Sequence, residues 1–165
     1  MKIGRALAEK KAAQNKLARL IAVRSQVFLH DKGKKPDMAM SELNADIESV
    51  TRTIRDFKLR IIYTNCNTHL DTGATLQEAI IQLGDIRSEL SAYNGLLNVQ
   101  PESEDELFSY RRRTAPRDRV PQLTKKDLLA RIEALEARKY ELDALIAKAN
   151  NTVELVERIP RGGRS

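Results

Sequence analysis

The chain has no tryptophan, a single cysteine and few aromatic side chains, which make up 4% of its 165 residues. A β-sandwich needs aromatic and β-branched residues in its sheets, so this composition disfavours that class of fold. Cys66 has no second cysteine to pair with, which suits a reducing compartment. No apolar run approaches the roughly 20 residues of a membrane-spanning helix, and the first residues, MKIGRALAEKKAAQ, lack the apolar core of a secretory signal. We therefore predict a cytoplasmic protein with no membrane span.

Charged residues make up 32% of the chain and apolar residues 41%, and the two kinds follow a helical period in four ranges. These ranges are about 2–29, 38–67, 75–97 and 125–150. The second has the clearest pattern, because six apolar residues follow one another at steps of four and three, as in a coiled-coil seam. They are Leu43, Ile47, Val50, Ile54, Phe57 and Ile61. Such a narrow seam needs a covering helix, and the sequence leaves open whether the same chain or a second copy provides it.

These ranges predict an all-α fold: a four-helix up-and-down bundle of long amphipathic helices in one domain over 1–157, with a basic tail at 158–165. The first two helices should form an antiparallel hairpin. The charges between the seam positions should face solvent, among them Arg52, Arg55, Asp56, Lys58 and Arg60. On the other helices the side chains expected to face inward are Ile3, Ala6, Leu7, Ala13, Leu17, Leu20, Ile21, Val27, Phe28, Leu76, Ala79, Ile80, Leu83, Ile86, Leu90, Tyr93, Leu97, Leu128, Ile132, Leu135, Leu142, Leu145 and Ile146.

The connection between the second and third helices is rich in residues that compete with the helical backbone for hydrogen bonds. Thr75 and Glu78 have the spacing of a capping box, in which the hydroxyl and the carboxylate each bind a free backbone N–H at the start of a helix. We therefore assign Thr64, Asn65, Gly73, Thr75 and Glu78 to one structural motif around this connection.

Helical periodicity is absent from about 98 to 123, which is an unusually long connection for a small domain. Its first part, 101–106, is acidic. Its second part is an arginine-rich arm, long enough for a short β-ribbon, that we expect to project from the bundle. The candidate interaction residues in this arm are Arg111, Arg112, Arg113, Arg117, Arg119, Phe108 and Tyr110.

A faint internal repeat relates the two halves of the chain. The run Leu43-Asn-Ala-Asp-Ile-Glu48 is similar to Leu128-Leu-Ala-Arg-Ile-Glu133, and the second and fourth helices both end in runs rich in Asn and Thr. One interpretation is a duplicated helical hairpin. The other is a chance similarity between amphipathic helices of limited composition.

Several short motifs occur in a characteristic order: Leu7-Ala-Glu9, Thr64-Asn65, Leu70-Asp-Thr-Gly-Ala-Thr-Leu-Gln-Glu-Ala79, Tyr110-Arg-Arg-Arg113 and Asn150-Asn-Thr152. In this order they resemble a family of small bacterial helical proteins of unknown function, sometimes labelled septicolysin-like, over about residues 5–155. The chain departs from the family pattern at Ile62, where the family usually has Asn, and in its proline-interrupted arm. The resemblance implies no agreed activity and no catalytic residue.

Charge is distributed unevenly along the chain, whose formal net charge is +6. Residues 1–35 contain ten basic residues (Lys or Arg) and two acidic ones (Asp or Glu). Residues 71–110 contain one basic and eight acidic residues, and residues 111–119 contain five basic residues and one acidic residue. We predict a homo-oligomeric assembly or interaction protein that uses its helix stripes, with Arg–carboxylate pairs from the arm. The alternative is a protein that binds nucleic acid, with phosphate contacts from the first helix and the arm at 111–119.

Residues that could support catalysis are sparse. Cys66, His69 and Asp71 could offer a thiolate, an imidazole and a carboxylate to a metal ion, but no second cluster completes the site. The glycines form no phosphate-binding loop between a strand and a helix. The sequence therefore predicts a protein that is not an enzyme, with no cofactor, no metal and no small-molecule substrate.

Overall fold

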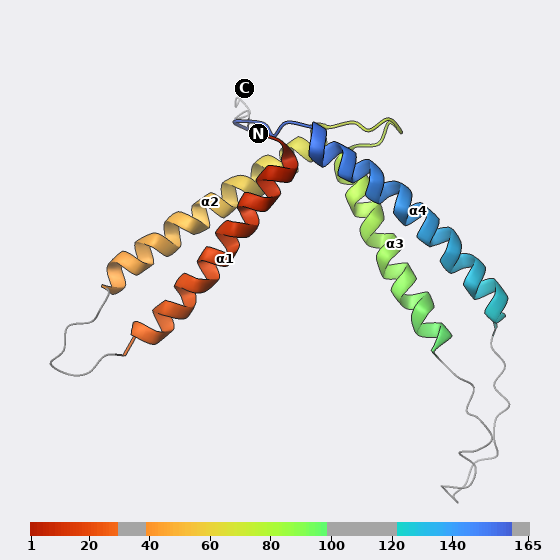
Figure 1. Ribbon diagram of the computed structural model, residues 1–165, viewed down its shortest axis with the longest axis horizontal. Coiled ribbons are helices and arrows are strands. Elements are labelled where there is room, and N and C mark those ends of the chain that lie inside the picture. Colours follow the sequence, from red (N-terminus) through yellow and green to blue (C-terminus); the bar gives the residue numbers. More distant parts are fainter. Residues whose placement is uncertain (30–38, 99–121, 160–165) are drawn as a thin grey trace, which may run out of the picture. The chain divides into compact units, whose positions relative to one another are not determined.

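The computed structural model describes residues 1–29, 39–98 and 122–159, and these form four helices (Figure 1). The helices are α1 (Ile3–Val27), α2 (Met40–Asn67), α3 (Leu76–Leu97) and α4 (Lys125–Thr152). The prediction of an all-α protein with four helices is confirmed, and each helix ends close to the limits of its predicted range. Most of the predicted arm, with its β-ribbon, and most of the basic tail lie outside the described residues.

The chain divides into two compact units. The first comprises Met1–Glu78 and Ile146–Ser165, and the second comprises Ala79–Leu145. The single domain proposed for residues 1–157 stays a prediction. None of the helices that the structure describes is both long and apolar enough to cross a bilayer.

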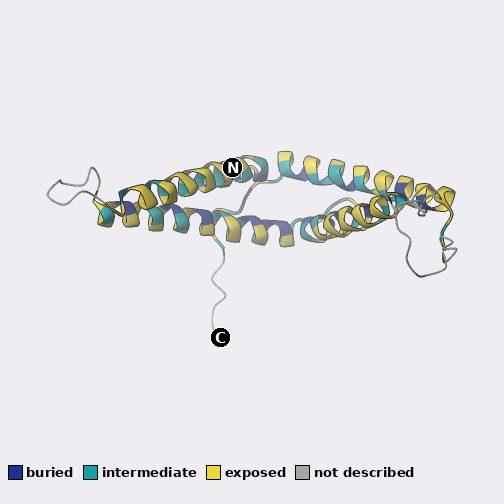
Figure 2. Cartoon of the chain, turned by 90° about the horizontal axis from the view of Figure 1, so that it is seen from below, coloured by how far each residue is buried: buried dark blue, intermediate teal, exposed yellow. Residues whose placement is uncertain are grey.

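In the first unit, α1 and α2 lie side by side and run in opposite directions (Figure 1). The seam of α2 is therefore covered by a helix of the same chain. Its members Leu43, Val50, Ile54 and Ile61 are buried, and buried positions recur between exposed ones along the helices (Figure 2). This packing settles the choice that the sequence left open for the seam.

Two inward predictions on the first helix are wrong, because Ile21 is 42% exposed and Phe28 is 69% exposed. Ile21 directly follows Leu20, and adjacent residues point about 100° apart on a helix, so only one of them faces α2. Phe28, the C-cap of α1, still has helical backbone angles, so it lies about 100° around the helix from the half-buried Val27 and points away from α2 in the same way.

In the second unit, α3 and α4 are antiparallel and are joined by polar contacts. Arg87 is 2.9 Å from Asp143, and Arg131 donates a 3.4 Å hydrogen bond to the hydroxyl of Tyr93. The first contact joins the middle of α3 to the second half of α4, and the other joins positions nearer the end of α3 and the beginning of α4. The inward residues predicted for these two helices are all buried or half-buried.

Two short backbone ladders join elements within the first unit. After α2, the N–H of Leu76 donates to the carbonyl of Thr68 at 2.8 Å and the N–H of Leu70 donates to that of Ala74 at 2.9 Å. After α4, the N–H of Ile3 donates to the carbonyl of Val153 at 3.1 Å and the N–H of Leu155 donates to that of Met1 at 2.7 Å. Each ladder also holds one antiparallel bridge, 69 with 75 and 2 with 154.

The two ladders are equivalent, position by position. Positions 68–70 correspond to positions 153–155, and positions 74–76 correspond to positions 1–3. Thr68 and Val153 are separated by the same number of residues as Leu43 and Leu128, where the two similar runs begin. Sequence similarity and backbone pairing thus give the same alignment of α2 with α4. This agreement favours an internal duplication over chance similarity.

Replacing Leu43 with alanine tests the intrachain seam, because this side chain is fully buried. We expect Leu43→Ala to lower the free energy of unfolding by about 2–5 kcal/mol, measured by chemical denaturation. The control Leu129→Ala removes a leucine that is 47% exposed. It should change the free energy of unfolding by no more than about 0.5 kcal/mol. Equal effects of the two substitutions would contradict the packing described here.

Candidate functional site

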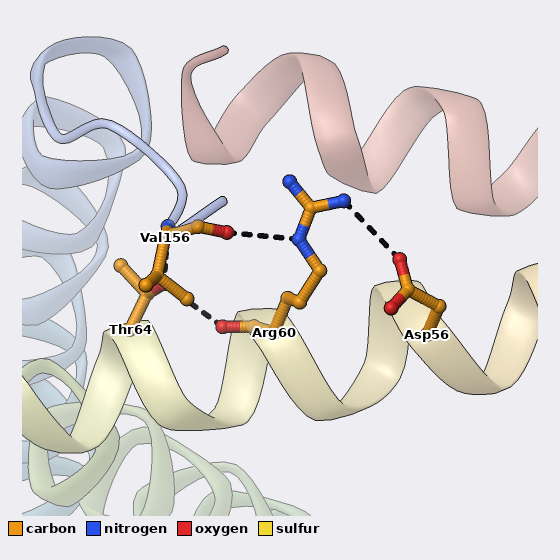
Figure 3. A network of polar contacts seen from close by, with 4 residues as sticks. All are labelled: Asp56, Arg60, Thr64 and Val156. Carbon is orange, nitrogen blue, oxygen red and sulfur yellow. Dashed lines mark hydrogen bonds and ion pairs between the residues drawn. The ribbon is translucent and has the colours of Figure 1, made fainter. Parts of the chain in front are cut away.

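A polar network at the end of α2 holds the segment that follows α4 (Figure 3). The N–H of Val156 donates to the hydroxyl of Thr64 at 3.1 Å, and that hydroxyl donates to the carbonyl of Arg60 at 2.8 Å. The Nε of Arg60 donates to the carbonyl of Val156 at 2.8 Å. Another nitrogen of the guanidinium lies 3.1 Å from the carboxylate of Asp56. Both backbone groups of Val156 are thus bound by side chains of α2.

Arg60 corrects one prediction, because we expected it on a solvated face and its side chain is only 19% exposed. The segment of Val156 crosses α2 there and covers it, next to a buried apolar cluster of Ala6, Ile61 and Leu155. The run Val-Glu-Leu-Val at 153–156 carries a signal that we missed, since apolar residues continue beyond the end of the helix. Such a segment needs partners for its backbone.

Thr64 and Asn65, which the sequence assigns to a structural motif, are both buried, at 6% and 5% exposure. The amide oxygen of Asn65 is buried too and accepts no hydrogen bond from any residue that the structure describes, which is uncommon in folded proteins. The corresponding residue at the end of α4 is Asn150. Its carbonyl oxygen lies 3.1 Å from the point where a Cβ on Gly4 would be, so glycine allows α4 to end close to the start of α1.

The rest of the motif forms the start of α3. Gly73 has a φ of +85°, which favours glycine. The N–H and the hydroxyl of Thr75 donate to the carboxylate of Glu78 at 2.7 and 2.9 Å, and the N–H of Glu78 donates back to that hydroxyl at 3.2 Å. The hydrogen bond from the N–H of Thr75 lowers the pKa of Glu78 below its ordinary value, and the bond from the Thr75 hydroxyl adds a smaller effect in the same direction. These contacts are those of a capping box.

In the structure, Asp71 of the candidate cluster Cys66, His69 and Asp71 is paired with a lysine. Asp71 lies 2.8 Å from Lys148, and this hydrogen bond with its charge lowers the pKa of Asp71 and raises that of Lys148. Within residues 1–29, 39–98 and 122–159, no three His, Cys, Asp or Glu side chains come together as metal ligands would.

A shallow depression lies between the end of α1 and the beginning of α2. It is lined by Arg24, Ser25, Phe28, Met40 and Asn44. Ser25 carries the hydroxyl of a possible nucleophile, but that hydroxyl donates to the carbonyl of Ile21, and the set contains no acid and no imidazole to act as its general base.

The side of α2 that points away from its seam carries exposed apolar side chains. Leu59 is 51% exposed and Ile62 is 53% exposed. Arg55, Lys58 and Cys66 are exposed on the same side. We call these five residues the outer face of α2. None of the residues predicted above to take part in an interaction lies on this face, although two large apolar residues outside a regular seam are a signal for it in the sequence.

The duplication provides an internal comparison for this face. The residues of α4 that correspond to Leu59 and Ile62 are Ala144 and Ala147, which are also exposed. A helix of this design therefore folds with alanine at both positions, so the large apolar residues on α2 are not a requirement of the fold.

The arm residues chosen from the sequence lie outside the described residues, and their role stays a prediction. They are Phe108, Tyr110, Arg111, Arg112, Arg113, Arg117 and Arg119.

Comparisons with known proteins identify the family. The model of a family of unknown function, DUF6847, matches residues 10–155, and the chain belongs to this family. The resemblance to a small uncharacterised family is thus confirmed, whereas the septicolysin-like label is not. A crystal structure of a functionally unknown conserved protein from Corynebacterium diphtheriae has the same fold, with a TM-score of 0.80 and 22% identity over 94% of this chain and 99% of that chain. No curated protein matches the chain.

Replacing Thr64 with valine tests the polar network. We expect Thr64→Val to lower the free energy of unfolding by about 1–3 kcal/mol, because the N–H of Val156 loses its acceptor. Thr152→Val is the matched control, since the exposed hydroxyl of Thr152 only donates to the carbonyl of Lys148. Chemical denaturation measures both effects. Slow hydrogen exchange at the amide of Val156 in Thr64→Val would show that the hydroxyl is not its acceptor.

Proposed function

We propose that this member of the DUF6847 family is a non-enzymatic cytoplasmic interaction protein that assembles with copies of itself. The observation that carries the proposal is the exposed apolar pair Leu59 and Ile62 on the outer face of α2. The seam of α2 is already covered by α1, so self-association needs another surface.

The apolar pair supports assembly for two reasons. The two side chains lie one turn apart on one side of a helix, so they form a continuous contact surface. The polar network that starts at Arg60 fixes this part of α2 to the segment after α4, so a partner meets a surface that is already ordered. Burying both side chains against a second copy would remove their exposed apolar area from water.

The double substitution Leu59→Ala with Ile62→Ala tests this function, because it gives α2 the residues that α4 carries at the same positions. We expect light scattering after size exclusion to show a multimer for the natural chain and a monomer for the variant. Both positions are exposed, so the free energy of unfolding should change by less than about 1 kcal/mol.

The matched control is Leu96→Ala with Leu129→Ala, which removes two apolar residues of similar exposure from α3 and α4. This control should keep the mass of the natural chain. A natural chain that is monomeric, or a Leu59/Ile62 variant that assembles normally, would contradict the proposal.

Nucleic-acid binding is the second candidate, and α1 favours it. This helix carries six Lys or Arg and one acid, Glu9. Among the described residues, only Arg5 of these six cations is ion-paired, with Glu9 at 3.0 Å. Lys11, Lys16 and Arg19 are exposed and could contact phosphates, together with the arginines predicted in the arm.

Removing three cations from α1 tests the second candidate. We expect Lys11→Gln with Lys16→Gln and Arg19→Gln to weaken binding to a mixed-sequence oligonucleotide and to reduce its salt dependence, because fewer counterions are released. Fluorescence anisotropy over a salt series gives both quantities.

The control for this experiment is Lys125→Gln with Lys126→Gln and Arg138→Gln, which removes three exposed cations of α4; Arg138 is paired within its own helix, with Glu141. It lowers the net charge by the same amount as the α1 variant. Salt-independent binding, no binding, or equal effects of the two variants would exclude α1 as a phosphate-binding surface.

A further inference from the structure

We infer that the outer face of α2 binds the acidic segment 102–108 of a second copy of this chain. The inference rests on the self-association proposed above and names the part of the partner that occupies the same surface.

The cations of the outer face are available to a partner. Arg55 and Lys58 are exposed and, within the part of the chain that the structure describes, neither takes part in an ion pair. The neighbouring arginines of α2 are ion-paired, because Arg52 lies 3.3 Å from Glu48 and Arg60 lies 3.1 Å from Asp56. The carboxylates closest along the helix are thus already paired. The outer face therefore presents two positive charges beside two apolar side chains.

The segment 102–108 has the complementary composition. It reads Glu-Ser-Glu-Asp-Glu-Leu-Phe, so four carboxylates are followed directly by Leu107 and Phe108. The segment lies outside the described residues, and its composition alone enters here. The chain carries a net charge of +6, so a second copy as a whole does not attract this face, and the attraction has to come from an acidic stretch. Nowhere else in the chain does a run of this length contain four acids and no base, which makes 102–108 the preferred partner.

Along the outer face of α2 and along the segment 102–108, charged residues come first and apolar residues follow. Along α2, Arg55 and Lys58 precede Leu59 and Ile62, and the centres of the two pairs are about 6 Å apart along the helix axis. A segment laid parallel to α2 would place its carboxylates over the cations and its apolar end over Leu59 and Ile62. Apolar burial would then supply most of the affinity, and the charges would set the orientation and the rate of association.

Complementation between two variants tests this inference. The face variant carries Leu59→Ala and Ile62→Ala and keeps the acidic segment. The segment variant carries Glu102→Gln, Glu104→Gln, Asp105→Asn and Glu106→Gln and keeps the face. Each should be monomeric alone, and an equimolar mixture should form a complex, because one chain contributes an intact face and the other an intact segment. Light scattering measures the masses, and circular dichroism checks that both variants are folded.

Cys66 provides a direct reporter, because it is the sole cysteine, is exposed and lies one turn beyond Ile62 on the outer face. An environment-sensitive dye on Cys66 of the segment variant should shift its emission to the blue when the unlabelled face variant is added. Added salt should reduce this shift, because the ion pairs are screened. The labelled segment variant mixed with unlabelled segment variant should give no shift.

The outcomes separate this inference from the proposed function. A complex in the mixture, with the dye shift, supports the inference. A segment variant that assembles like the natural chain, while the face variant does not, overturns the inference and leaves self-association standing. Two monomeric variants that do not combine overturn it as well, since the segment then acts within its own chain. A monomeric natural chain overturns both.

Discussion

The first unit depends on the binding of one extended segment across a helix. A regular α-helix has no free backbone groups along its length, because each N–H and C=O is already bonded within the helix. A chain that crosses it must therefore find its partners in side chains, since unpaired buried backbone groups are costly. Arg60 and Thr64 supply these partners to the N–H and the carbonyl of Val156. Leu155 can then enter the apolar cluster with Ala6 and Ile61 while its own N–H binds the carbonyl of Met1.

The difference between the two equivalent ladders explains why side chains like Arg60 and Thr64 bind the segment after α4 and not the segment after α2. The ladder after α2 joins residues 68–70 to 74–76, which a short turn through Gly73 already keeps together. The ladder after α4 joins residues that no short turn connects, so its closure costs more conformational entropy. Arg60 and Thr64 offset part of this cost. Their counterparts on α4 are Leu145 and Ala149, which offer no polar side chain to a crossing segment.

The sequence predicted what depends on periodicity and local chemistry. The steps between Leu43 and Ile61 located α2 and its buried side, and the spacing of Thr75 and Glu78 located the start of α3. Periodicity gives the direction of a side chain around its own helix and does not report which other segment crosses there. For this reason periodicity alone places Arg60 in solvent. Periodicity also places Ile21 and Phe28 in the core, because the apolar stripe on α1 is wider than the contact that α1 makes with α2.

The candidate site was less predictable than the fold, because an exposed apolar pair leaves no periodic pattern. The sequence shows that Leu59 and Ile62 lie outside the regular seam, but it does not show that α1 covers the seam and leaves these two side chains exposed. The structural motif at Thr64 and Asn65 was selected as a local feature, whereas the main contact of Thr64 is with Val156, far along the chain. Contacts over such separations depend on the fold as a whole.

Internal duplication adds a control that most chains lack. Where both halves carry the same residue, as with Asn65 and Asn150, the shared design of the helix pair is a sufficient explanation. Where exposed positions differ, the design cannot explain the larger residue. Leu59 and Ile62 correspond to alanines in α4, and exposed Ile81 on α3 corresponds to Ala8 on α1. Alanine is the better helix former at an exposed position. The fold therefore does not require leucine or isoleucine at these positions, and burial against a partner, as proposed above, would account for the pair Leu59 and Ile62.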